Sequence, residues 1–183
     1  RPVKSETALL EQWRVALQNA QAQTEINTRV ADFGYNEAKL QEGQALWEST
    51  KTIWEANKQL DLQTKQASNN FKEQRDNLYN LYSTHRKKAK AKFKRESQIL
   101  EQLQIATAQP TSYLNILQTI KHFYNQVAQN EEISTQLQSY NIEASEFETA
   151  NNLITTTEAT RAEYIKKEGE SASDVFYWLE LLP

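Results

Sequence analysis

The chain has 183 residues, a formal net charge of −3 and a hydrophobic content of 38%. A chain of this length is expected to form one domain spanning residues 1–183 and to bury a core. Its mean hydropathy is −0.80, and no apolar window is long enough to predict a membrane-spanning helix. The absence of cysteine excludes disulfides and thiolate metal sites. With no signal peptide visible, a cytoplasmic location is favoured, although the true N-terminus could lie upstream of Arg1.

The first predicted helix spans residues 5–32. Ser5 is a candidate N-cap, and apolar residues such as Trp13 and Leu17 follow it at helical spacing. Residues 33–36 then interrupt the pattern. Gly34 suits the left-handed conformation that closes a helix, and Asn36 suits the cap of the next one. A joint this short predicts an antiparallel helical hairpin.

The second predicted helix spans residues 36–107, a stretch with no proline and with Gly43 as its only glycine. Apolar or small residues recur in it at steps of three and four, the helical period. They include Leu46, Thr50, Ile53, Asn57, Leu60, Thr64, Ala67, Phe71, Leu78, Tyr82, Ala89 and Phe93. Residues 67–70 are the weakest place, but the stripe passes through them in register, so a continuous helix is predicted. Trp47 and Trp54 are one heptad apart and are expected to face a partner helix.

Further helices are predicted at 112–139, 143–168 and 172–182. Pro110 ends the second helix because proline lacks a backbone donor, and Thr111 or Ser112 can cap the third. Gly169 is expected to end or bend the fourth. Residues 175–182 are the most apolar run in the chain. This tail is interpreted as docking on the bundle or on a second subunit; the alternative is an exposed partner-binding helix.

A shift of 107 residues aligns the first part of the chain with the last. Phe33, Gly34 and Tyr35 fall on Tyr140, Asn141 and Ile142. Glycine and asparagine tolerate positive φ better than other residues, so the two joints are expected to share a conformation. The pattern predicts two copies of a helix–joint–helix unit, at 5–107 and 112–183. The predicted fold is all-α: an elongated antiparallel bundle of long helices, coiled-coil-like, made from two duplicated hairpins.

The joint Phe33-Gly34-Tyr35-Asn36-Glu37-Ala38-Lys39-Leu40-Gln41-Glu42-Gly43 resembles a segment of uncharacterised bacterial all-helical proteins built from such duplicated units. The resemblance covers the joint itself, while the rest of the chain matches only in its helical periodicity. It implies a shape and supplies no activity, cofactor or site residue.

Catalytic signatures are not found in the sequence. The two histidines, His85 and His122, are 37 residues apart, and neither lies in a recognisable motif. His85 falls near the inner stripe of the long helix, which favours a partly buried structural imidazole. No metal-ligand motif or phosphate-binding loop occurs either. The sequence therefore predicts no catalytic, cofactor-binding or metal-binding residue, no cofactor and no small-molecule substrate.

A basic segment at residues 86–95 is the polar feature that stands out. It contains Arg86, Lys87, Lys88, Lys90, Lys92, Lys94 and Arg95, so the remainder of the chain carries a formal charge of −10. Three interpretations stay open. The segment is a solvated helix face loosely paired with the acidic C-terminal half, a binding site for nucleic acid or acidic lipid, or a guide for charge-directed assembly.

Taken together, these patterns favour a non-enzymatic structural or protein–protein interaction role. A protein partner or self-association is the expected mode of action. The alternative is an anionic-surface binder that acts through residues 86–95.

Overall fold

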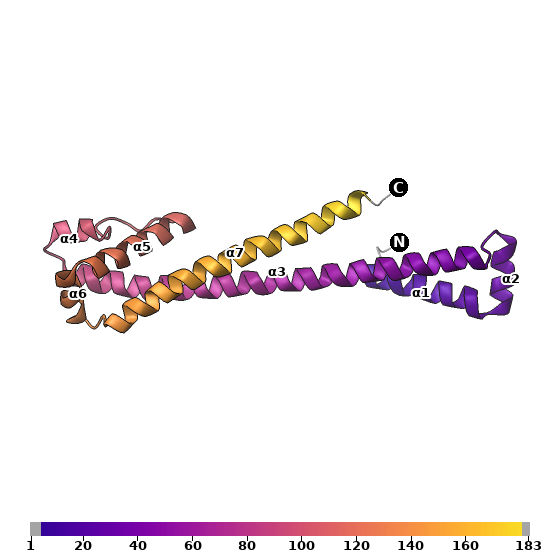
Figure 1. The fold of residues 1–183 in the computed structure, drawn as a ribbon, viewed down its shortest axis with the longest axis horizontal. Coiled ribbons are helices and arrows are strands. Elements are labelled where there is room, and N and C mark those ends of the chain that lie inside the picture. Colours follow the sequence, from indigo (N-terminus) through magenta and orange to yellow (C-terminus); the bar gives the residue numbers. More distant parts are fainter. Residues whose placement is uncertain (1–4, 181–183) are drawn as a thin grey trace. The chain divides into compact units, whose positions relative to one another are not determined.

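The computed structural model describes residues 5–180, with side chains described through Ser171. Every regular element in this range is an α-helix, as the spacing of apolar residues predicts. The helices are α1 (Glu6–Ala22), α2 (Thr24–Asp32), α3 (Glu37–Lys92), α4 (Ser97–Gln102), α5 (Tyr113–Gln129), α6 (Glu131–Gln138) and α7 (Ala144–Glu180). Two compact units divide the chain: the N-terminal unit, Arg1–Leu62, and the C-terminal unit, Gln63–Pro183. Helix α3 runs from the first unit into the second (Figure 1).

The N-terminal unit is a helical hairpin in which α1 and α2 fold back along the start of α3 (Figure 1). The indole N–H of Trp47 donates to the carbonyl oxygen of Leu10 at 2.9 Å. Gly43 allows close approach, because a Cβ at this position would lie 3.0 Å from Cδ2 of Leu17. The buried apolar residues of this unit are Leu10, Ala20 and Leu40. The hairpin therefore has a thin core.

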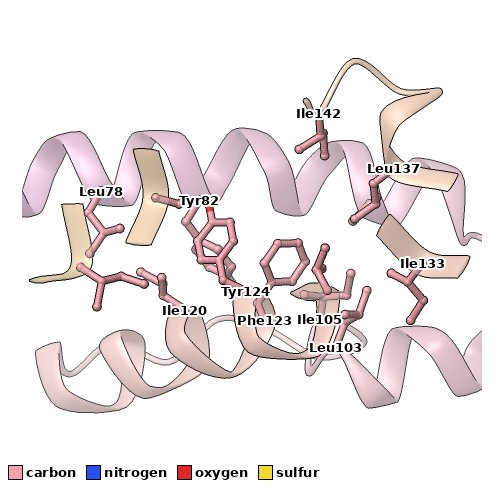
Figure 2. Close-up of a cluster of buried hydrophobic side chains, with 14 of the residues drawn as sticks. Leu78, Tyr82, Leu103, Ile105, Ile120, Phe123, Tyr124, Ile133, Leu137 and Ile142 are labelled. Carbon is pink, nitrogen blue, oxygen red and sulfur yellow. The ribbon is translucent and has the colours of Figure 1, made fainter. Parts of the chain in front are cut away.

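The C-terminal unit holds a much larger core. Side chains from α3, α5, α6 and α7, together with the loop after α4, meet in one cluster (Figure 2). Its buried members include Leu78, Tyr82, Phe93, Leu103, Ile105, Ile120, Phe123, Tyr124, Val127, Ile133, Leu137 and Ile142. Burying each large apolar side chain contributes about 1.5–3 kcal/mol, so this cluster dominates the stability of the unit.

The predicted helix 5–32 is wrong in one respect, because Gln23 breaks it with φ −101° and ψ 112°. No proline or glycine marks this place in the sequence. The carbonyl oxygen of Ala20 would be left without a helical partner there, but it accepts from Nδ2 of Asn27 at 3.0 Å. This substitute bond lowers the cost of the break, since unpaired groups at helix ends otherwise rely on water or side chains. The caps at Ser5 and Asn36 are confirmed: each accepts from the backbone N–H three residues later.

The predicted helix 36–107 is continuous through residues 67–70, but it ends at Lys92 and not at 107. The chain turns at residues 93–96 and forms the short α4. This turn allows Phe93, Leu103 and Ile105 all to reach the same core with no exposed surface. Burial of two further large side chains outweighs the few helical hydrogen bonds lost, each worth about 0.5–1.5 kcal/mol net.

The predicted helix 112–139 is also divided, at Asn130. The Asn130 side chain accepts from the N–H of Ile133 at 3.1 Å and so caps α6, a role for which asparagine is well suited. The predicted helices 143–168 and 172–182 are instead parts of the single helix α7, which passes through Gly169. One glycine costs a helix only about 1 kcal/mol, which its neighbours can offset. The side chains of the apolar tail at 175–182 lie outside the described residues.

The same local geometry recurs at positions 107 residues apart. Gly34 and Asn141 both adopt positive φ, 88° and 55°. At the first joint Phe33, Gly34 and Tyr35 donate to Val30, Ala31 and Val30; at the second, Tyr140, Asn141 and Ile142 donate to Leu137, Gln138 and Leu137. The extended residues Gln23 and Asn130 are also 107 apart, as are the starts of α3 and α7.

Candidate functional site

The basic segment lies in the last turns of α3 and in the turn that follows. Two of its seven predicted residues serve the protein's own fold. Nη2 of Arg86 donates to the carbonyl oxygens of Ile105 and Thr107, in the loop after α4. Nζ of Lys88 donates to the carbonyl oxygen of Asn141, in the joint before α7. The structure thus assigns these two cations to backbone carbonyls that a turning chain would otherwise leave without helical partners.

The other five basic residues are not tied to carboxylates. Lys87, Lys94 and Arg95 are exposed, while Lys90 and Lys92 are half-buried. The ammonium group of Lys92 lies 5.9 Å from the ring centre of Phe93. Within the described part of the chain, the ion pairs involve other bases. These five side chains therefore form a cationic surface at the end of α3.

A polar cluster sits inside the apolar core of the C-terminal unit. His85 on α3 is fully buried, and its Nδ1 lies 2.9 Å from the hydroxyl oxygen of Tyr124 on α5. Its Nε2 lies 3.6 Å from a carboxylate oxygen of Glu146, at the start of α7. Tyr124 is also buried. A substrate cannot reach this imidazole unless the core opens, so the cluster joins three helices rather than forming a reactive site.

The electrostatics of the cluster follow from its burial. Burial lowers the pKa of the His85 imidazole, and the neighbouring Glu146 carboxylate offsets this only in part. Burial likewise raises the pKa of the Tyr124 hydroxyl. Partial burial would raise the pKa of Glu146, but the N–H of Glu143 and the nearby His85 and Lys88 together hold it below its usual range. His85 is therefore neutral near pH 7, as the interpretation of a structural imidazole requires.

A surface groove of about 450 Å³ runs between α5 and α7. The guanidinium of Arg161 lies 5.0 Å from the ring centre of Tyr113 in its wall. The groove's one carboxylate, Glu158, pairs with Lys121 at 2.6 Å. Two carboxylates, or a carboxylate and a histidine, would be needed for paired acid–base chemistry, and this groove does not bring such a pair together.

The N-terminal unit exposes large apolar side chains that the sequence places on inner stripes. Trp13 is 50% exposed and Leu46 is 70% exposed. At the joint, Phe33 is 82% exposed and Tyr35 is 59% exposed. Trp54, expected to face a partner helix, is half-buried and donates to a carboxylate oxygen of Glu6 at 3.1 Å. Periodicity alone could not reveal this exposure, because it depends on which segments cover the stripe.

Searches for other kinds of site add little. Among the described residues, no group of three or more histidine and acidic side chains is arranged to hold a metal ion. Within the same range, no helix combines the length and the apolar character that crossing a membrane requires. No family model, curated protein or solved structure matches the chain.

Proposed function

We propose that this protein is a non-enzymatic structural or protein–protein interaction protein. The observation that carries the proposal is the exposure of Trp13, Phe33, Tyr35 and Leu46 on one small hairpin. Monomeric proteins seldom leave several large apolar side chains uncovered in one region, and such regions commonly mark binding sites for other proteins. Aromatic side chains are also enriched at the energetic centres of such interfaces.

The proposal includes an architecture of two copies of one helix–joint–helix unit. Three correspondences at the same 107-residue spacing support it: the hydrogen-bonded joints, the extended breaks at Gln23 and Asn130, and the starts of α3 and α7. Slow divergence of a duplicated unit explains why backbone geometry agrees where side chains differ. Repeats of this kind commonly present surfaces for partners.

An antiparallel arrangement of long helices is also part of the proposal. In the C-terminal unit, Oγ1 of Thr64 donates to the carbonyl oxygen of Lys167 at 3.2 Å. One or two turns further along, Phe71 stacks with Tyr164 at a ring-centre distance of 6.2 Å. Sequence numbers rise on α3 as they fall on α7, which supports antiparallel pairing of these helices. Helical faces of this kind suit recognition of other helices.

Sedimentation velocity of a fluorescently labelled full-length chain tests the interaction role. The chain is measured alone and in an extract of its source cells. An interaction protein sediments faster than a 21.2 kDa monomer in at least one of the two conditions. A monomer in both would refute the proposal, and so would a measured turnover that depends on any single carboxylate.

A second candidate function is binding to anionic surfaces through the basic segment. The observation that favours it is that Lys87, Lys90, Lys92, Lys94 and Arg95 have no ion pair with a described carboxylate. Binding that releases counterions from a polyanion weakens as salt rises. The remaining acidic character of the chain opposes it, which is why this function ranks second.

The test compares the wild-type chain with a variant in which those five residues are changed to glutamine. Arg86 and Lys88 stay intact, because they hold backbone carbonyls in the fold. Binding to duplex DNA, single-stranded RNA and acidic liposomes is measured at two salt concentrations. A salt-sensitive affinity that the five changes remove supports the function. Equal binding by both proteins removes it.

A further inference from the structure

The N-terminal unit has one side that we call the open face: Trp13 and Ala16 on α1, and Leu46 and Ile53 on α3. Trp13, Ala16 and Leu46 are exposed, and Ile53 is half-buried. Helix α1 contacts α3 through other residues, because Leu10 receives the indole N–H of Trp47 and Leu17 lies against Gly43. The open face is therefore beside the α1–α3 contact and not part of it.

The C-terminal unit shows what covers the equivalent face. Positions 107 residues after Trp13 and Ala16 are Ile120 and Phe123, and both have no exposed surface. Tyr82 of α3 meets Phe123 edge-on at a ring-centre distance of 5.5 Å (Figure 2). Leu153, the counterpart of Leu46, is partly buried against the same cluster. The equivalents of the open face thus share one side of their hairpin and are covered by a helix.

The covering helix uses a stripe that continues into the N-terminal unit. In the C-terminal unit the stripe of α3 includes Leu78 and Tyr82. At helical spacing, the same stripe passes through Leu60, Ile53 and Leu46. Within one hairpin this stripe cannot cover Trp13, because α1 already packs on the neighbouring side of α3. A second copy of the chain offers both a matching stripe and a face that needs one.

We propose that the open faces of two copies of this chain bind each other. Helix α1 of each copy packs on the Leu46–Leu60 stripe of its partner, which joins two hairpins into a four-helix arrangement. Each copy gives and receives the same contact, so the interface closes as a symmetric dimer. Covering Trp13 and Leu46 removes apolar area from water, which is the driving force for association. This inference rests on the proposed interaction role and names its partner.

The first experiment measures the mass of the purified full-length chain by sedimentation equilibrium. Wild type is expected to be a dimer, and Leu46→Glu to raise the dimer Kd at least about tenfold, as charge at an apolar interface centre does. Trp13→Glu provides a second variant on α1. Leu114→Glu is the matched control, because Leu114 is 57% exposed but lies on α5. Circular dichroism checks that each variant keeps its helix content.

A second experiment locates the contact. The chain has no cysteine, so Ala16→Cys and Thr50→Cys each create one unique thiol. Mixed and treated with a short bismaleimide, the two variants are expected to give a covalent pair that contains one copy of each. Ala162→Cys, at an exposed position on α7, is the control and should pair with neither.

Each outcome decides the matter. A wild-type dimer that Leu46→Glu and Trp13→Glu dissociate, with the expected cross-links, supports the inference. A dimer that survives both changes, or that cross-links equally through Ala162→Cys, overturns the open face as the contact. A wild type that is monomeric alone but sediments faster in the cell extract overturns self-association, while the proposed interaction role stands.

Discussion

Phe123 is the most direct probe of the C-terminal core. Its side chain has no exposed surface, and it meets Tyr82 and Tyr124 edge-on at ring-centre distances of 5.5 and 5.1 Å. Phe123→Ala removes the ring and leaves a cavity among α3, α5 and their neighbours. Substitutions of this kind cost about 3–5 kcal/mol, of which the lost aromatic pairs account for about 0.5–1.5 kcal/mol each.

Urea unfolding followed by circular dichroism measures this cost. Because the chain has two compact units, the data are fitted with two transitions and the change is assigned to one of them. With a urea dependence of about 2 kcal/mol per molar, a loss of about 4 kcal/mol lowers the midpoint by about 2 M. Leu114→Ala, at an exposed position on the same helix, should cost less than about 1 kcal/mol. Equal costs for the two variants would refute the assignment of Phe123 to the core.

The remaining predictions concern the joint, the buried histidine and the basic segment. Gly34→Ala should destabilise the N-terminal unit by about 1–2 kcal/mol, because its φ is +88°, whereas Gly169→Ala, in open helix, should stabilise by about 0.8–1.0 kcal/mol. The free energy of unfolding of the C-terminal unit should fall as the pH drops below about 6.5, because unfolded His85 binds a proton that the buried imidazole rejects. Arg86→Gln should cost about 1.5–3 kcal/mol by removing charged hydrogen bonds to two carbonyls, whereas exposed Lys87→Gln should change stability by less than about 0.5 kcal/mol.

Thermal and urea unfolding monitored by circular dichroism check all three. A Gly34→Ala variant as stable as wild type would contradict the left-handed conformation. For the pH dependence, His85→Gln is the control and should flatten the slope between about pH 6.5 and 5, above the range where carboxylates titrate. An unchanged slope would place its origin in another group. Equal stability of the Arg86 and Lys87 variants would show that Arg86 is a surface cation like its neighbours.

The candidate surfaces were predictable only in part. The density of bases at residues 86–95 is visible in the chain, but its division is not. Arg86 and Lys88 bond to carbonyls that are 19 to 53 residues away in sequence, and no local pattern encodes such contacts. Likewise, Trp13 and Ile120 occupy matching places on two amphipathic helices, and one is half exposed while the other is buried.

Local features of this chain are legible in its residues because they depend on near neighbours. Helical spacing, the caps at Ser5 and Asn36, and the left-handed joint at Gly34 all arise from backbone sterics and short-range hydrogen bonds. The break at Gln23, the turn after Lys92 and the contrast between a thin hairpin and a full core required the folded chain. Hydrophobic burial has no direction of its own, so a stripe becomes core or surface according to which distant segment packs on it.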